Sequence, residues 1–219
     1  MARQRKITTI REQVYSILRE DICGGKYQPG TRLQEVELAE SLNVSRSPVR
    51  EALRQLVSDG LLFEIPNKGV FVKEFTAKDI DEIYDMRVLL ECYGIQHCKG
   101  KITSTRLERL LRIQSEMEST FERRDLEAYT ACDEKLHVQL VRLADNSLIN
   151  DTYERVRSMN QQFRVLALMD EKRFAESLDE HRTIIQSIIT GDLQTAIDVD
   201  RHHLDLARDA IRSRMLQEE

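Results

Sequence analysis

The sequence predicts a mainly α-helical protein in two parts, a head that contains short strands and a body made of helices alone. All three prolines and five of the eight glycines lie at or before residue 69. Beyond that residue the chain has no proline and is rich in Leu, Glu, Arg and Ala, which favours helices joined by short turns. The charge divides in the same way, because residues 1–75 carry a balance of +2 and residues 76–219 one of −7. We therefore expect two domains, 1–75 and 76–219, with separate tasks.

The composition excludes several classes of protein. With 41% hydrophobic and 32% charged residues, the chain is too apolar for a disordered tail and too charged for a bilayer protein. It contains no run of 18 apolar residues that could form a membrane-spanning helix. The four cysteines form neither a CxxC pair nor a zinc-finger spacing, which is typical of reduced thiols in a cytoplasmic protein.

Residues 34–56 predict two short helices joined by a turn. Leu38 and Leu42 lie one helical turn apart in the first helix. Asn43 occupies the turn, where a left-handed backbone is needed and Asn tolerates it, and Ser45 can cap the second helix. The second helix carries an apolar face at Val49, Ala52, Leu53 and Leu56. This spacing predicts a helix-turn-helix.

Hydroxyl and basic side chains gather at the solvent-facing start of the second helix, at Ser45, Arg46, Ser47 and Arg50. Such groups suit phosphate contacts and the bidentate reading of guanine in a major groove. Two β-prone runs, 61–65 and 70–72, then flank a Pro-Asn-Lys-Gly turn. They predict a hairpin with a basic tip, the wing of a winged helix. The alternative is an ordinary helical hairpin with a solvated basic face.

The head resembles the DNA-binding domain of the GntR family of bacterial transcription regulators over roughly residues 8–73. The resemblance is carried by Tyr27-Gln28-Pro29-Gly30-Thr31-Arg32-Leu33, Leu38-Ala39-Glu40, Val44-Ser45-Arg46-Ser47-Pro48-Val49-Arg50-Glu51-Ala52-Leu53 and Asp59-Gly60-Leu61. It implies contacts with operator DNA from Ser45, Arg46, Ser47 and Arg50. It also implies that the wing enters the minor groove with Lys68 and Gly69.

The body is predicted to contain six helices, at about 77–98, 104–123, 126–143, 147–169, 172–190 and 193–216. Thr76 and Asp79 have the form of a capping box, so they open the first of these helices. Asp125, Asn146 and Asp192 are the predicted N-caps of the third, fourth and sixth.

Ionisable side chains interrupt the inward apolar stripes of three of these helices. Asp133 and His137 lie one turn apart in the third helix, His181 lies in the fifth and His203 in the sixth. If these helices pack together, three imidazoles and one carboxylate converge, which suits a divalent transition metal such as zinc, nickel or manganese. The alternative is that each histidine is a hydrogen-bonded core residue.

The first body helix places Arg87 on its inward stripe, with Glu91 one turn later. A planar guanidinium near a metal would bind the carboxylate of an effector. An internal Arg87–Glu91 pair is the alternative, and both can hold if the pair positions the guanidinium.

The body resembles the all-helical FCD ligand-binding domain of the FadR subgroup of GntR regulators over roughly residues 78–215. The resemblance is carried by Tyr84-Asp85-Met86-Arg87 with Glu91, Asp133-xxx-His137 followed by Asn146, Glu180-His181, and Gly191-Asp192 with Ala196 and His203. It implies an antiparallel helix bundle, a homodimer, and a small carboxylate effector that reaches a bound metal. The metal ligands it implies are Asp133, His137, His181 and His203.

Our main hypothesis is a dimeric transcription regulator, most often a repressor in such families, whose operator affinity changes when an organic acid binds the body. Two-fold symmetry predicts a palindromic operator. A hypothesis from another class is a metal-dependent hydrolase or oxygenase with the head as a targeting module. It lacks an evident general base, because Glu134 and Glu180 neighbour the predicted ligands but point about 100° around their helices.

Overall fold

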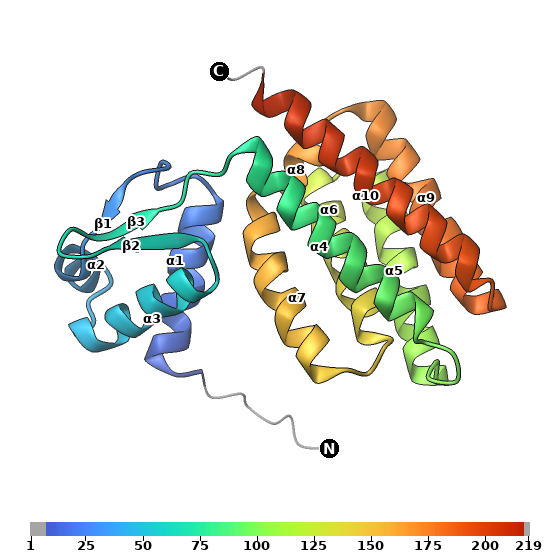
Figure 1. Ribbon diagram of the computed structural model, residues 1–219, viewed down its shortest axis with the longest axis horizontal. Coiled ribbons are helices and arrows are strands. Elements are labelled where there is room, and N and C mark those ends of the chain that lie inside the picture. Colours follow the sequence, from blue (N-terminus) through green and yellow to red (C-terminus); the bar gives the residue numbers. More distant parts are fainter. Residues whose placement is uncertain (1–7, 217–219) are drawn as a thin grey trace. The chain divides into compact units, whose positions relative to one another are not determined.

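The computed structural model describes residues 8–216, so residues 1–7 of the predicted head and 217–219 of the predicted body lie outside the described part (Figure 1). The chain forms two compact units that adjoin in sequence between Phe75 and Thr76. The predicted fold class, a winged helix-turn-helix followed by an all-α bundle, is confirmed. Among the described residues, no helix is long and apolar enough to cross a membrane.

The head contains three helices and a small antiparallel sheet within the described region. The sheet has the order β1-β3-β2, and β2 pairs with β3 so that Phe63 lies opposite Phe71. The elements are α1 (Ile10–Cys23), β1 (Arg32–Leu33), α2 (Glu35–Ser41), α3 (Arg46–Ser58), β2 (Leu62–Ile65) and β3 (Gly69–Val72). The expected helix-turn-helix and wing are therefore α2–α3 and β2–β3.

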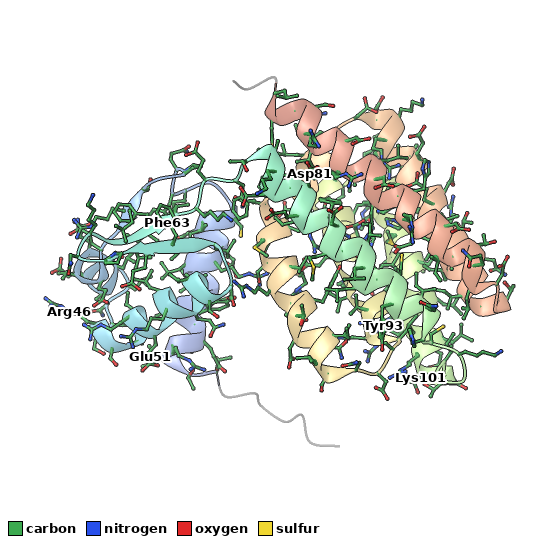
Figure 2. The ribbon with its side chains drawn as sticks, viewed as in Figure 1. Arg46, Glu51, Phe63, Asp81, Tyr93 and Lys101 are labelled. Atoms are coloured by element: carbon green, nitrogen blue, oxygen red, sulfur yellow. The ribbon has the colours of Figure 1, made fainter. Side chains whose placement is uncertain are left out.

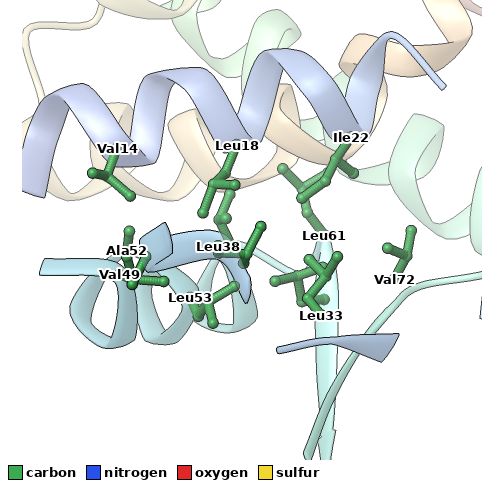
Figure 3. Close-up of a cluster of buried hydrophobic side chains, with 13 residues drawn as sticks. Val14, Leu18, Ile22, Leu33, Leu38, Val49, Ala52, Leu53, Leu61 and Val72 are labelled. Atoms are coloured by element: carbon green, nitrogen blue, oxygen red, sulfur yellow. The ribbon is translucent and has the colours of Figure 1, made fainter. Parts of the chain in front are cut away.

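Helix α1 closes the hydrophobic core of the head and was not among the elements expected from the sequence. Figure 3 shows Leu18 of α1 directed toward Leu38 and Leu53. A capping box formed by Thr9 and Glu12 opens α1. Its buried residues are Val14, Leu18 and Ile22, which are spaced four residues apart. The capping box and this spacing are the sequence signals that indicate the helix.

The turn between α2 and α3 has the backbone that the sequence predicts. Asn43 adopts a positive φ of 51°. Ser45 lies at the N-cap of α3, yet its side chain makes no capping hydrogen bond. The expectation that its hydroxyl caps the helix is therefore wrong, and the hydroxyl stays exposed at the start of α3.

In the body, the helix starts are confirmed by their capping interactions, whereas the fourth predicted helix is interrupted. Thr76 forms its capping box with Asp79, and the predicted N-caps Asp125, Asn146 and Asp192 each accept a backbone hydrogen bond. The helices are α4 (Ala77–Gln96), α5 (Ser104–Glu122), α6 (Leu126–Arg142), α7 (Ser147–Asn160), α8 (Arg164–Ala167), α9 (Glu171–Thr190) and α10 (Leu193–Met215). As Figure 1 shows, α10 lies between α4 and α9 and packs against both.

The predicted helix 147–169 is wrong as a single element. Helix α7 ends at the fully buried Asn160, and the 3₁₀ turn η1 (Gln161–Phe163) separates it from α8. A 3₁₀ turn has fewer residues per turn than an α-helix, so it changes which face the following residues present. Phe163, Arg164 and Ala167 are buried as a result. No glycine or proline marks this break in the sequence.

Gly94 allows α4 to approach α6 closely. A Cβ at this position would overlap the carbonyl oxygen of Leu140 and lie 2.7 Å from the Cα of Val141. Both opposing atoms belong to the backbone of a packed helix, so neither can move aside as a flexible side chain would. The close contact aligns α4 with the stretch of α6 that holds His137.

We expect Gly94→Ala to destabilise the body. Overpacking of this kind costs roughly 1–3 kcal/mol of unfolding free energy. Urea denaturation of the full chain measures the change, and Gln96→Ala, at an exposed position of the same helix, is the control that should stay within about 0.5 kcal/mol of wild type. Equal stability of the two variants would contradict the close helix contact.

Candidate metal centre and DNA-binding surface

Three helices of the body bring one carboxylate and three imidazoles together. Helix α6 carries Asp133 and His137, α9 carries His181, and α10 carries His203. One ligand atom from each lies within 4.8 Å of those from the others. All four side chains are buried, with exposed fractions between 1% and 7%. The structure thus gathers the four residues that interrupt the apolar stripes.

Two of the imidazoles turn the same ring nitrogen, Nε2, toward the carboxylate of Asp133. The Nε2 atoms of His137 and His181 lie 3.5 and 3.3 Å from Oδ1 of Asp133. Within the described residues, neither Nε2 has a hydrogen-bond partner. A buried nitrogen without a partner is costly, so the arrangement fits a cation that all four residues would hold. A bound divalent metal would offer an electrophilic site for ligand oxygen atoms.

The buried charges divide the histidines into one cationic and two neutral rings. Against the desolvation of a buried ring, the charges of Glu91 and Asp133 raise the pKa of His137 to about 9. Burial and the neighbouring imidazoles hold the pKa values of His181 and His203 well below the ordinary value. Burial acts to raise the pKa of Asp133, but the charge and hydrogen bond of His137, together with the charges of His181 and His203, lower it well below its usual range.

Arg87 is buried and forms the predicted pair with Glu91. Its Nε donates to Oε1 of Glu91 at 2.9 Å, and the two side chains are 4% and 0% exposed. The guanidinium also lies over the ring of Tyr84, 5.1 Å from its centroid. Nη2 of Arg87 has no hydrogen-bond partner among the described residues. The pair therefore fixes one edge of the guanidinium and leaves a donor for another acceptor.

Asp200 is a buried residue of this centre that the sequence reasoning missed. Both of its oxygens lack hydrogen-bond partners within the described chain, and Oδ1 lies 4.0 Å from Nδ1 of His137. The inward stripe that the sequence predicts for this helix is Ala196, Val199, His203, Leu206 and Ala210, whereas the buried residues are Ala196, Asp200, His203, Leu204, Ala207 and Ile211. Asp200 lies four residues after Ala196 and three before His203, so helical periodicity could have placed it on the buried face.

The start of α3 presents the predicted DNA-contacting side chains to solvent. Arg46 and Ser47 are exposed in the first turn, and Figure 2 shows Arg46 pointing away from the core of the head. Arg50 is also exposed, but its Nε and Nη2 donate to Glu35 of α2 at 2.9 Å. Arg50 is therefore held against α2, which its place in the sequence did not indicate.

The wing ends in a tight turn with a basic side chain at its tip. Asn67 and Gly69 have positive φ angles of 62° and 107°, as a two-strand hairpin requires. Lys68 between them is exposed. A Cβ on Gly69 would approach Arg32 of β1 to 3.1 Å. The tip thus presents an exposed lysine next to a glycine whose position leaves little room for a side chain.

The family models match both units of the chain. The model of the bacterial regulatory proteins of the gntR family matches residues 10–72, and that of the FCD domain matches residues 82–206. The chain belongs to the GntR family and carries an FCD domain. The FadR subgroup is consistent with this pairing of domains.

Relatives and solved structures agree with this assignment. The chain is 33% identical to the uncharacterized HTH-type transcriptional regulator YdhC of Bacillus subtilis (strain 168), covering 80% of this chain and 79% of that protein. It is 30% identical to the gluconate operon transcriptional repressor of the same organism, covering 92% and 85%. A crystal structure of a GntR regulator from Rhodococcus sp. RHA1 covers 94% of this chain and 99% of that chain, with a TM-score of 0.77 and 28% identity.

The domains and relatives identify a DNA-binding transcriptional regulator of the GntR family, not an enzyme. The hypothesis of a metal-dependent hydrolase or oxygenase is therefore not supported. The structure records no disulfide among the cysteines of the described residues.

Metal binding to this centre should release about one proton at neutral pH. Asp133 is ionised and two histidines are neutral, whereas His137, with its pKa of about 9, must lose a proton before Nε2 can bind a metal. Below pH 9 the apparent affinity for Zn²⁺ should therefore rise close to tenfold per pH unit. Calorimetric titration in two buffers of different ionisation enthalpy counts the proton. An affinity that is level between pH 7 and 8 would contradict a raised pKa at His137.

Proposed function

We propose that this regulator is a homodimeric repressor that binds a palindromic operator and responds to a small carboxylate bound at a metal in its body. The buried quartet of Asp133, His137, His181 and His203 is the observation that carries the proposal. The relative that represses a gluconate operon supports repression as the direction of regulation. Zinc, nickel and manganese all accept such ligands. Acting on the bacterial chromosome, the protein would work in the cytoplasm.

Arg87 supports an organic acid as the effector. Its unpartnered Nη2 is buried in the same interior as the quartet, and the charge of Asp133 acts on its guanidinium. A carboxylate could accept from this donor and offer its other oxygen to the metal. A thermal-shift screen of small carboxylates, with Zn²⁺ present, would find acids that raise the melting temperature of the wild type but not of Arg87→Ala.

Regulation requires that the acid favour one state of the protein over another. A ligand shifts an equilibrium only by its difference in affinity for the two states. Arg87 lies on α4, which begins at Ala77, and four residues separate it from Val72, where the wing strand β3 ends. The helix that would hold the acid is therefore the first helix after the head in the chain.

Arg46→Ala should weaken operator binding by roughly 1–3 kcal/mol, which is a loss of about 5- to 150-fold in affinity, if Arg46 reads a base edge. Fluorescence anisotropy with a fragment of the protein's own promoter region at moderate salt measures the affinity. Arg112→Ala removes the same charge at an exposed position of the body and is the matched control. Equal binding by the two variants would exclude Arg46 from the interface, and no binding by the wild type would count against the whole proposal.

His181→Ala should lower the amount of bound metal, because it removes one of the four ligands. Elemental analysis after dialysis against Zn²⁺ measures the stoichiometry. His202→Ala, at an exposed position next to His203, should bind as much metal as the wild type. An unchanged stoichiometry in His181→Ala would leave the hydrogen-bonded core histidine as the better interpretation.

A further inference from the structure

Glu91 contacts three polar side chains from three different helices. Oε1 accepts from Nε of Arg87 on its own helix and from the hydroxyl of Tyr153 on α7, both at 2.9 Å. Oε2 lies 2.5 Å from Nδ1 of His137 on α6. Glu91 is fully buried, so no water competes for these positions. The orientation of the carboxylate is therefore fixed from three sides.

The charge state of Glu91 decides which atom carries the proton in its contact with His137. Its contacts define this state: the guanidinium of Arg87, a permanent cation, and the hydroxyl of Tyr153 both donate to Oε1, so Glu91 is present as the carboxylate anion. A carboxylate anion only accepts hydrogen bonds. Nδ1 of His137 must therefore be the donor, and the lone pair that is left for a metal after deprotonation is on Nε2.

The same orientation of the ring recurs at the other two histidines. Nδ1 of His181 contacts the hydroxyl of Tyr129 at 3.2 Å, and Nδ1 of His203 lies 2.7 Å from Oε2 of Glu180. Nδ1 of His203 also lies 3.0 Å from Nη2 of Arg173, so its protonation is not defined by a single partner. At His137, by contrast, Nδ1 contacts a carboxylate, which can only accept, so the position of the proton on Nδ1 is defined.

We propose that Glu91 is a positioning residue for the metal centre, which holds His137 with its proton on Nδ1 and its Nε2 directed at the metal. The inference rests on the proposed function, since it assumes that the quartet binds a metal. It goes beyond that proposal by adding a residue that touches neither metal nor effector. Carboxylates behind metal-binding histidines strengthen metal affinity by about 10- to 100-fold in other proteins.

An ordinary buried ion pair does not account for this arrangement. A pair that served stability alone would need only one donor for each carboxylate oxygen, and it would not require Nε2 of His137 to remain without a partner. Instead the ring is bound at Nδ1 and open at Nε2, with Asp133 beside the open atom at 3.5 Å. Nδ1 of His137 thus holds the ring in place through Glu91, whereas Nε2 is left for a metal.

The test is the affinity of the full-length protein for Zn²⁺, measured by competition with a chromophoric chelator, in the wild type and in Glu91→Gln. The introduced amide keeps the shape of the side chain but presents an NH₂ group on one side. Whichever way it turns, either His137 or the Arg87–Tyr153 side loses its acceptor. We expect the affinity of Glu91→Gln to fall by about 10- to 100-fold.

Glu134→Gln is the matched control. Glu134 follows Asp133 on α6 and carries the same charge, but its recorded ion pairs are with Arg157 and Arg164 and not with an imidazole. The Zn²⁺ affinity of Glu134→Gln should stay within about threefold of the wild type, because the lost charge acts on the metal only through space. Equal losses in both variants would overturn the role of Glu91, because general electrostatics would then explain them.

A measurement on the wild type alone removes dependence on how well the variant folds. Long-range ¹H–¹⁵N spectra of the Zn²⁺-loaded protein should show His137 protonated at Nδ1 and metal-bound at Nε2. Binding through Nδ1, or a proton on Nε2, would overturn the inference. If the wild type binds no Zn²⁺, the proposed metal site itself fails; if it binds and Glu91→Gln binds equally well, only the role of Glu91 fails.

Discussion

Charge compensation without water is the constraint on which the interior of the body depends. Arg87, Glu91, Asp133 and His137 are all less than a tenth exposed, and none could remain charged there alone. Their contacts form one chain, from the guanidinium through the carboxylate of Glu91 to the imidazolium and on to Asp133. The chain alternates in sign along its length. This alternation explains why His137 is cationic, while burial and the charge of the neighbouring imidazole keep His181 and His203 neutral.

The sequence predicted which residues belong to this centre better than it predicted the contacts between their side chains. Asp133 and His137 could be paired because a spacing of four residues fixes them on one face of a helix whatever the rest of the fold does. His181 and His203 required only that three apolar stripes face a common interior. Asp200 was missed because the predicted stripe of α10 passes from Ala196 to His203 through Val199, whereas the buried face passes through Asp200. The contact between Glu91 and His137 could not be predicted, since it depends on how closely α4 approaches α6, and that distance is set by the missing side chain of Gly94.

In the head, local signals were sufficient for the turn and the wing, but not for the state of Arg50. Its guanidinium binds both oxygens of Glu35, and the pair is partly exposed. Exposed pairs of this kind contribute about 0–1 kcal/mol, less than a charge-assisted contact with a phosphate in a site from which counterions are released. Glu35 therefore orients Arg50 against α2 at little cost, and it does not prevent the guanidinium from turning to DNA. Within the part of the chain that the structure describes, Arg46 forms no such ion pair, which makes it the sharper probe of the surface.

The two halves of the proposed mechanism meet on α4. Arg87 and Glu91 lie one turn apart on this helix, which follows the wing in the chain after a short segment. A metal at Nε2 would replace the proton that the cationic His137 carries on that atom, and an acid at Nη2 would supply the acceptor that Arg87 lacks. Both events would act on the carboxylate of Glu91, because its two oxygens hold the two groups separately. Metal and acid would then each alter the binding of the other, since coupling between sites is reciprocal. The side chain of Glu91 would therefore couple metal and effector in addition to the oxygen that the acid offers to the metal.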